Sequence, residues 1–408
     1  MPPPTIAIVA HVETPYRVAL HRRFAREIPE IALHTLYTHG HPNQPWADLS
    51  TPDINPVPFG PAESVERRPS LPKLFGDYFK AGRIIRWLTA HNARAVFISG
   101  YYDVGRVRLF RWCHRRGIPV FLLADSNILS DEARGARAVV KRLFVGRIIN
   151  WSTAILTFAS AGARFYFRYG ADASKIIFCP HEPDYAAIES TTPAHVAAVG
   201  TRFALDPART RFVCCGRLEP VKRPDLAVTA FVAAAPRLPD WDLVMIGDGA
   251  LRTRCASLVP AELQHRVKFL GFLADPRDIA AVYLQSHILI VPSDSEAWGL
   301  VVNEAETAGM AVIASDVVGA IPELIRPGRN GATFPRGDTA SLTAAMLALA
   351  EPSALARARA ASPRIIADWR TCGDPVTGMR LALARAGVLG PAPRHRSTHH
   401  PVGVDERP

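Results

Sequence analysis

Short apolar runs alternate along the chain with longer stretches whose apolar residues recur at helical spacing. In the first half we expect strands at residues 6–10, 95–99, 119–124 and 154–158. The longer stretches predict helices at residues 17–28, 104–116, 134–150 and 162–169. Strands that alternate with helices in this way form parallel sheets covered by helices on both faces.

The same alternation resumes after a polar, turn-rich segment at residues 180–206, which we interpret as a linker. The second series predicts strands at residues 211–215, 243–246, 267–270, 287–291 and 311–314. Its helices are expected at residues 224–235, 279–285, 299–308 and 340–350. The pattern therefore predicts an α/β protein built from two doubly wound, Rossmann-like domains in tandem.

The two series set the expected domain boundaries. We place the first domain at residues 1–195 and the second at residues 207–360. A further helix is expected at residues 365–388, and a Pro/Gly-rich loop at residues 42–61. Residues 391–408 are polar and His-containing, which is typical of a disordered, solvated tail more often than of a metal site.

Length and composition agree with two soluble domains. A chain of 408 residues exceeds what one hydrophobic core usually supports. Its 48% hydrophobic and 21% charged residues are ordinary for a globular protein, and no apolar run approaches the length of a membrane-spanning helix. The N-terminus has no basic segment before an apolar one, so no secretory signal is expected. Six cysteines without metal-ligand spacing indicate reduced thiols and a cytoplasmic protein.

The net charge of +11 is uneven. Residues 1–200 hold 24 basic and 16 acidic side chains, a balance of +8, and the remainder holds 24 and 21, a balance of +3. A basic half can attract an anionic membrane or nucleic acid, and it is more often typical of a solvated, arginine-rich surface. No RNA-binding motif accompanies the charge, so nucleic acid is not an expected partner.

Two carboxylates, Glu296 and Glu304, stand with seven residues between them. Glu296 follows a predicted strand, at the position where ligands bind in open α/β sheets. Glu304 lies about one and a half turns into the next helix. They can therefore meet opposite ends of an extended ligand that carries hydroxyl groups at both ends and a phosphate beside the helix N-terminus.

Two cations follow the first strand of the second series. Arg217 comes directly after Gly216, and Lys222 precedes the next helix. A guanidinium and an ammonium group together neutralise a diphosphate, the first by paired hydrogen bonds and the second as a point charge. Taken alone, such a pair is most often simply solvated. Gly247 opens a G-D-G turn that either lets the backbone approach a ligand or only connects a strand to a helix.

The order of these motifs resembles the retaining GT-B glycosyltransferases of glycosyltransferase family 4. The motifs in question are G-R-L-x3-K-R, G-D-G, E-x7-E and a Gly-Ala-Ile-Pro-Glu loop at residues 319–323, all within residues 207–350. Thr14-Pro15-Tyr16-Arg17 followed by Phe24 is similar to the opening of many bacterial members. The resemblance implies a GT-B fold, with two Rossmann-like domains facing each other across a cleft and the 365–388 helix crossing back onto the first domain.

The resemblance also implies roles for the site residues. Arg217 and Lys222 would hold the donor diphosphate, Glu304 the ribose hydroxyls and Glu296 the transferred sugar beside the reacting centre. Gly216 and Gly247 would contribute close backbone approaches, and the 319–323 loop would line the pocket. The remaining donor contacts would be backbone amides at Trp298, Gly299 and Leu300. No cofactor and no obligatory metal are expected, because the cations stabilise the leaving diphosphate.

The acceptor, a glycan or a lipid-linked molecule, is expected on the first domain, with four candidate residues: His11, Tyr16, Arg17 and Asp125. Family members often have a Gly-Gly pair where this chain has His11 and its neighbours, and a histidine where it has Asp125. Asp125 therefore either orients the acceptor hydroxyl or caps a helix before Ile128. His11 is interpreted either as part of the cleft or as a turn residue without a catalytic role.

Two alternative functions remain open from the sequence: a nucleotide-sugar epimerase of the same fold, and a non-catalytic nucleotide-sugar-binding protein. Residues 74–88 combine aromatic and aliphatic side chains with lysine and arginine, a pattern of helices that lie on anionic membranes and also of helices that pack on a core. We therefore expect a cytoplasmic protein, with peripheral contact to the inner face of the cell membrane as a hypothesis.

Overall fold

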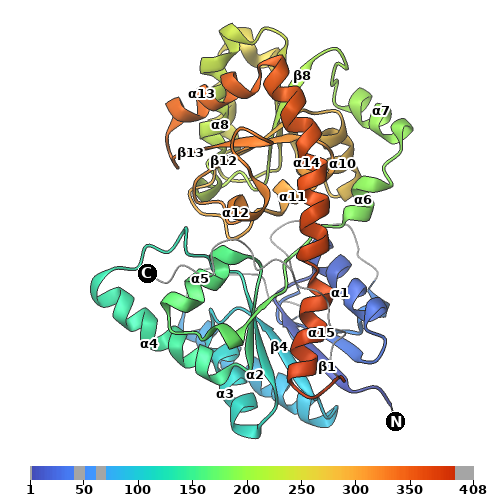
Figure 1. Ribbon diagram of the computed structural model, residues 1–408, viewed down its shortest axis with the longest axis vertical. Coiled ribbons are helices and arrows are strands. Elements are labelled where there is room, and N and C mark those ends of the chain that lie inside the picture. Colours follow the sequence, from blue (N-terminus) through green and yellow to red (C-terminus); the bar gives the residue numbers. More distant parts are fainter. Residues whose placement is uncertain (1, 41–50, 61–69, 391–408) are drawn as a thin grey trace. The chain divides into compact units, whose positions relative to one another are not determined.

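The structure is a computed structural model, and it describes residues 2–40, 51–60 and 70–390. The chain divides into two compact units, residues 1–181 with 373–408 and residues 182–372. The predicted tail at 391–408 and part of the predicted 42–61 loop lie outside the described residues. Each unit is built on its own parallel sheet (Figure 1).

Within the described residues, the first unit holds a seven-stranded parallel sheet in the order β3-β2-β1-β4-β5-β6-β7. Its strands are β1 Thr5–Ala10, β2 Ala32–Tyr37, β3 Pro56–Pro58, β4 Ala95–Ser99, β5 Val120–Ala124, β6 Ala154–Thr157 and β7 Ile176–Phe178. Its α-helices are α1 Pro15–Glu27, α2 Leu71–Ala90, α3 Val104–Arg116, α4 Gly135–Trp151, α5 Ser160–Arg168 and α15 Pro375–Arg385.

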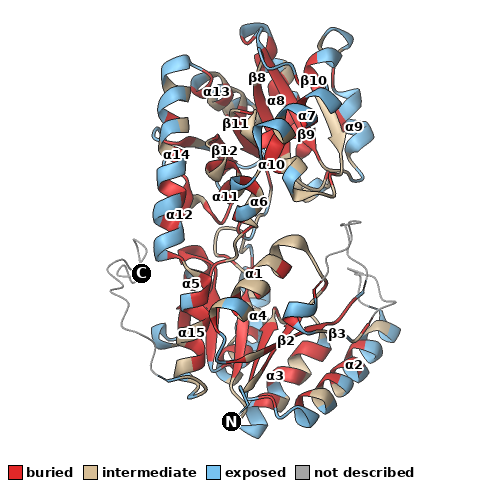
Figure 2. Ribbon diagram, turned by 90° about the vertical axis from the view of Figure 1, so that its right-hand side faces the viewer, coloured by how far each residue is buried: buried red, intermediate tan, exposed pale blue. Residues whose placement is uncertain are grey.

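The sheet of the first unit is buried on both faces. Ala7 and Val9 of β1 pack in one core with α2, α3 and α4, while Ile6 and Ile8 pack in another with α1 and α15. Successive strand residues point to opposite faces, which is why a sheet covered on both sides reads as an uninterrupted apolar run (Figure 2).

The second unit holds, in its described residues, a six-stranded parallel sheet in the order β10-β9-β8-β11-β12-β13. Its strands are β8 Thr210–Cys215, β9 Trp241–Ile246, β10 Val267–Gly271, β11 Ile288–Val291, β12 Ala311–Ser315 and β13 Gly331–Phe334. Its α-helices are α6 Tyr185–Glu189, α7 Pro193–Arg202, α8 Pro224–Ala234, α9 Arg252–Ser257, α10 Pro276–Leu284, α11 Leu300–Thr307, α12 Ile321–Leu324, α13 Thr339–Leu349 and α14 Pro352–Cys372.

All predicted strands form, and two predictions are wrong in detail. The predicted linker at 180–206 contains α6 and α7, whose first turns are capped by Asp184 and Thr192. The predicted single helix at 365–388 is the end of α14 followed by α15. The chain breaks between them because the Asp374 side chain accepts the amide of Thr377 and starts a new helix, which belongs to the first unit.

Candidate active site

The strand order of the second unit defines where a ligand can bind. Connections run outward in one direction from β8 through β9 to β10, and in the other from β11 through β12 to β13. In open parallel sheets the loops that leave the carboxyl ends of the two central strands therefore diverge and leave a crevice. Here those loops begin at Gly216, after β8, and at Pro292, after β11.

An ion pair joins the two loops. The Lys222 ammonium group donates to Oε2 of Glu296 in a close contact, and the two side chains are 25% and 16% exposed. The amide of Asp294 also donates to the carbonyl of Val221 at 2.9 Å, which ties the loop backbones together. The lysine and the first of the paired acids, predicted separately from the sequence, thus meet at the carboxyl edge of the sheet, where both remain accessible to a ligand.

Arg217 leaves β8 toward the same edge. Its Nη1 lies 2.6 Å from Oε2 of Glu219, and its side chain is 30% exposed. This places a second cation in the same loop as Lys222. Each of the two has a carboxylate partner at hand, so the charges of the loop are balanced before any anionic ligand arrives.

Glycine is required at two predicted positions of this edge, 216 and 247, for different physical reasons. Gly216 has φ +148° and open space where a Cβ would point, so a ligand can approach its backbone. Gly247 has φ +121°, and a Cβ there would lie 2.0 Å from the carbonyl oxygen of Gly216. The G-D-G turn is therefore required for packing of the β9 loop against the β8 loop, and its backbone approaches protein.

Gly299 starts helix α11 in the left-handed region, with φ +97°. The first amides of α11, from Leu300 onward, are oriented along the helix axis as in anion-binding helix termini. The loop after β12 lies beside them, because the amides of Gly319 and Ala320 donate to the carbonyls of Glu296 and Trp298 at 3.1 and 2.9 Å. The predicted 319–323 loop thus belongs to the same site.

The Trp298 side chain has a structural role. It is 3% exposed, and its indole Nε1 donates to Oδ1 of Asn303 at 2.9 Å. Nδ2 of Asn303 in turn donates to the hydroxyl of Tyr185 at 2.9 Å, and the indole ring lies 5.4 Å from that of Trp369. The Trp298 side chain is thus part of the protein interior, and the predicted backbone contact with a donor stays a prediction.

Glu304 has the most perturbed carboxyl group of the site. It lies one and a half turns into α11, and burial raises its pKa to about 7. The hydroxyl of Tyr283, from α10, donates to its Oε2 at 3.2 Å and opposes that rise by stabilising the charged form. A carboxyl group poised near neutrality at a ligand-binding edge is a functional candidate on physical grounds.

The sequence prediction missed Tyr283 and Cys215, which both surround Glu304. Tyr283 is fully buried on α10, and burial together with Glu304 raises the pKa of the Cys215 thiol above its usual range. Both read in the sequence as core residues of a helix and a strand. The packing of α10 beside α11 brings Tyr283 to the carboxyl group, and Cys215 reaches it from the end of β8, so no local signal could have found them.

In the first unit, His11 lies at the carboxyl edge of β1, next to the end of β4. Its ring is 4.4 Å from that of His39 and 5.2 Å from that of Tyr102. Burial, with the charges of Arg106 and Arg17 nearby, lowers the pKa of His11 to about 2. The imidazole is therefore neutral at physiological pH and can act as a hydrogen-bonding and stacking group.

Tyr16 and Arg17 extend the same edge from the start of α1. Nη1 of Arg17 donates to the carbonyl of Val12 at 2.6 Å, and its guanidinium lies 5.5 Å from the centre of the Tyr16 ring. The Tyr16 ring is 5.7 Å from that of His181, which follows β7. Burial lowers the pKa of His181 to about 3. This histidine was also missed by sequence reasoning, because it stands outside every motif.

Asp125 is exposed directly after β5. Its alternative interpretation as a helix cap before Ile128 is wrong. The turn that follows is held by Asn127, whose Oδ1 accepts the amide of Ser130 at 3.0 Å, and the next helix of the described chain, α4, begins at Gly135. The carboxyl group of Asp125 thus lies at the carboxyl edge of the first sheet, with the charges of Arg17 and Arg106 nearby.

Metal and membrane features were sought in residues 2–40, 51–60 and 70–390. No group of three or more His, Cys, Asp or Glu side chains there is arranged to hold a metal ion. No single helix of these residues is long and apolar enough to cross a membrane, although the bent pair Thr339–Leu349 and Pro352–Arg385 meets the length and composition criteria together.

Comparison with known proteins shows what the second unit resembles. Residues 209–352 match the model of the glycosyl transferases group 1. A D-inositol 3-phosphate glycosyltransferase of Segniliparus rotundus is 25% identical over 391 residues, 90% of this chain and 83% of the relative. Another protein of that name, from Rhodococcus jostii, is 32% identical over 206 residues, 48% of this chain and 44% of the relative.

Solved structures share the fold along most of the chain. HepE of Anabaena, solved with UDP and glucose, has a TM-score of 0.70 at 17% identity and covers 94% of this chain and 100% of its own. Sucrose-phosphate synthase of Thermosynechococcus elongatus has a TM-score of 0.71 at 19% identity, and the match covers 90% of this chain and 96% of the synthase. The chain thus has the GT-B fold, and residues 209–352 of its second unit resemble the glycosyl transferases group 1.

Proposed function

We propose that this protein transfers a sugar from a UDP- or GDP-sugar to an acceptor with retention of anomeric configuration, in bacterial polysaccharide or glycolipid assembly. The observation that carries the proposal is the Lys222–Glu296 pair, which joins the loops of β8 and β11 at the strand-order switch, with Glu304 on the following helix. HepE, which shares the fold, has also been solved with UDP-glucose, and that supports a nucleotide-sugar donor here.

The donor would lie across this edge from Glu304 to Glu296. Glu304 would accept the two ribose hydroxyls, while Arg217, Lys222 and the first amides of α11 would bind the diphosphate. Lys222 has three donors, so it can bind a phosphate oxygen and keep Glu296 as a partner. Glu296 would then accept hydroxyls of the transferred sugar and would be held in place by Lys222.

The chemistry follows from where charge develops. The bond between the anomeric carbon and the diphosphate oxygen breaks, and a bond to the acceptor oxygen forms on the same face. The acceptor proton passes to the leaving phosphate oxygen. Negative charge grows on the diphosphate, and Arg217 and Lys222 would stabilise it more strongly in the transition state than in the bound donor. We therefore propose a reaction without an obligatory metal ion or a protein nucleophile.

Substitution of the pair tests the site. Lys222→Ala and Glu296→Ala should each lower transfer by roughly a hundredfold or more, since each removes a charged contact at the reacting end of the donor. Arg254→Ala, at an exposed arginine on α9, is the matched control. Product anomers assigned by NMR test retention. Full transfer by both active-site variants would contradict the assignment.

Different experimental results would indicate an epimerase or a non-catalytic binding protein. Incubation with a panel of sugar nucleotides alone would yield an epimerised nucleotide if the protein were an isomerase. Donor binding without turnover, in the presence of lipid and glycan acceptors, would favour the binder. The proposal expects donor binding, product only when an acceptor is added, and no epimerised donor.

The exposed side chains of the first unit support, as part of this proposal, a lipid-linked acceptor at an anionic membrane. The first half of α2 exposes Phe75 and Phe79, at 62% and 63%, and α4 exposes Val140 and Leu143, at 67% and 72%. Helices that follow parallel strands begin at the carboxyl edge, so these side chains lie toward the end of the unit that holds His11. Exposed arginines flank the apolar residues of α4, at positions 134, 137, 142 and 147.

A further inference from the structure

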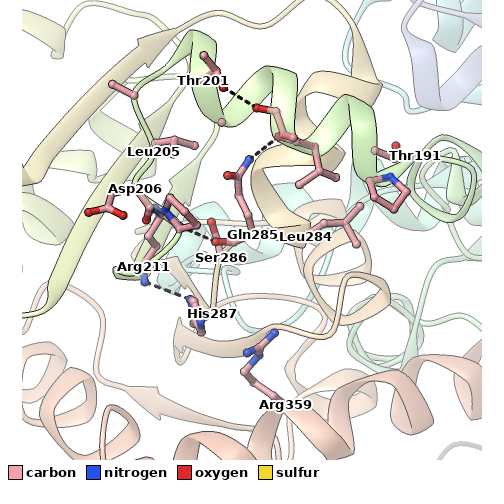
Figure 3. Close-up of a pocket in the computed structure, with 16 residues that line it drawn as sticks. Thr191, Thr201, Leu205, Asp206, Arg211, Leu284, Gln285, Ser286, His287 and Arg359 are labelled. Atoms are coloured by element: carbon pink, nitrogen blue, oxygen red, sulfur yellow. Dashed lines mark hydrogen bonds between the residues drawn. The ribbon is translucent and has the colours of Figure 1, made fainter.

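A second cavity lies at the opposite edge of the sheet that carries the candidate donor site. It has a volume of about 1040 Å³, is open to solvent, and is lined by α7, the α7–β8 connection, the end of α10 and α14 (Figure 3). Arg211, the second residue of β8, and His287, which precedes β11, both line it. This places it at the amino ends of β8 and β11, the strands whose carboxyl ends form the candidate donor site.

Beside this cavity stands a buried cation, Arg211, on which the carboxylates of Asp242 and Asp206 act without forming an ion pair. Arg211 is 1% exposed, and its guanidinium donates to two backbone carbonyls, those of Asp206 and Gln285. In the described part of the chain no carboxylate lies within ion-pair distance of it, and Asp242 is already paired with Arg209 at 2.7 Å. A buried charge is stable only with compensation, so an anion in the adjoining cavity would be favourable.

Arg359 and His287 supply donors at the cavity surface. Nε of Arg359 donates to the carbonyl of Gly309 at 3.0 Å, which anchors the guanidinium and leaves both Nη groups for another acceptor. The Arg211 amide donates to Nδ1 of His287 at 3.2 Å, so the neutral ring carries its proton on Nε2. Burial and the two arginines lower the pKa of His287 to about 4. Figure 3 shows Arg359 extending from α14 toward His287.

The rest of the lining is largely apolar. Val196 and Pro193 come from α7, Leu205 and Pro207 from the connection to β8, and Leu284 from the end of α10. The lining contains one acidic side chain, the exposed Asp206, whose Oδ1 accepts the amide of Ala208 at 2.9 Å. With two arginines and one aspartate, the cavity has a formal charge of +1.

We propose that this cavity binds a small amphipathic anion, with a carboxylate or phosphate head held by Arg359 and His287 and an apolar body along α7 and Leu284. Its volume is at the upper end of the range of small-molecule sites. The site is separate from the candidate donor site and does not depend on the assignment of the transfer reaction.

The experiment measures thermal stabilisation of the full chain by octyl phosphate, octanoate, inorganic phosphate and octanol. At a hundredfold excess over its dissociation constant, the preferred ligand should raise Tm by roughly 5 to 10 °C. Octyl phosphate or octanoate should act at far lower concentration than inorganic phosphate or octanol. The stronger of the two identifies the head group. Equal stabilisation by octanol would overturn the anion site, and equal stabilisation by inorganic phosphate would overturn the apolar part.

Variants locate the site. Arg359→Ala should weaken the binding of the preferred amphiphile about tenfold or more, as measured by calorimetry, because a charged donor is lost. Arg357→Ala, at an exposed position two residues away on α14, should bind like the parent. Val196→Ser should weaken octyl phosphate or octanoate and leave the affinity for inorganic phosphate unchanged. Unaltered binding in Arg359→Ala, or no stabilisation by either amphiphile, would overturn the proposal.

Discussion

Glu304 is a carboxyl group whose charge state at neutral pH is set by burial, which raises its pKa to about 7. Its ionised form has two charged oxygens that accept from both ribose hydroxyls, and protonation turns one of them into a donor. The affinity for a nucleotide-sugar should therefore fall by about tenfold between pH 8 and pH 6, as the ionised fraction falls. Calorimetric titration at several pH values tests this. Glu304→Gln should bind the nucleotide-sugar weakly, with an affinity that does not change with pH. An affinity of the parent protein that does not change with pH would contradict the role of Glu304.

The same shift affects stability with the opposite pH dependence. Because the folded-state pKa of Glu304 lies above its ordinary value of 4.5, its stabilising contribution is complete below about pH 4.5 and is lost as the pH rises through about 7. The ionised carboxylate is thus a local cost that the free protein carries at neutral pH. This is the expected signature of a group retained for binding and not for folding.

Tyr283 tunes that group without reaching the ligand itself. Its hydroxyl stabilises the charged form of Glu304 across 3.2 Å. In Tyr283→Phe the pKa of Glu304 should rise further, so the midpoint of the pH dependence of donor affinity should move to higher pH. At pH 9, where Glu304 is ionised in both proteins, the affinities should converge. A uniform loss of affinity at every pH would indicate damage to the fold instead.

At the level of elements, most strands were predicted, while β2, β3, β7, β13 and several connections were not. β11 and residues 212–214 of β8 are apolar and almost fully buried, which is the signal of a central parallel strand. β3 and β7 have three residues each, too few to produce a periodicity. α6 and α7 were missed because their polar, turn-like sequences hide the capping residues Asp184 and Thr192.

In the candidate site, too, some residues could be placed from the sequence and others could not. Arg217, Lys222, Glu296 and Glu304 could be predicted because they occupy loops and a helix start next to recognisable strands. Tyr283 could not, because its contact with Glu304 depends on how α10 and α11 pack. Sequence spacing fixes which edge of the sheet a residue reaches. It does not fix which buried neighbour from another helix sets the pKa of that residue.

The turn after β9 offers a prediction at this scale. Gly247→Ala would place a methyl group 2.0 Å from the Gly216 carbonyl oxygen at φ +121°, so we expect a loss of more than about 3 kcal/mol of stability. Gly328→Ala is the matched control: its φ is +77° with nothing within 4 Å, and about 1 kcal/mol is expected. Denaturant melts measure both. Equal losses would mean that the loop contact is readily relieved.

The two units differ in what they present to solvent. Of the 12 strongly exposed large hydrophobic side chains among the described residues, 11 lie in the first unit and only Leu258 lies in the second. The first unit holds 29 basic and 16 acidic side chains, a balance of +13, and the second holds 19 and 21, a balance of −2. Apolar and basic surface thus coincide on the unit proposed to bind the acceptor. In its described residues the second unit, which would hold a soluble nucleotide-sugar, does not combine exposed apolar side chains with a basic surface.

This asymmetry predicts membrane binding through the first unit. The full chain should co-sediment with vesicles of phosphatidylglycerol at low salt and less with phosphatidylcholine, because each basic residue near an anionic surface contributes about 1 kcal/mol. Replacement of Phe75 and Phe79 by serine should weaken sedimentation by roughly tenfold or more, through loss of buried apolar area. Leu258→Ser removes the exposed hydrophobic side chain of the second unit and should leave it unchanged. If both variants sediment like the parent, charge alone attracts the protein, and the apolar residues of α2 have no part in docking.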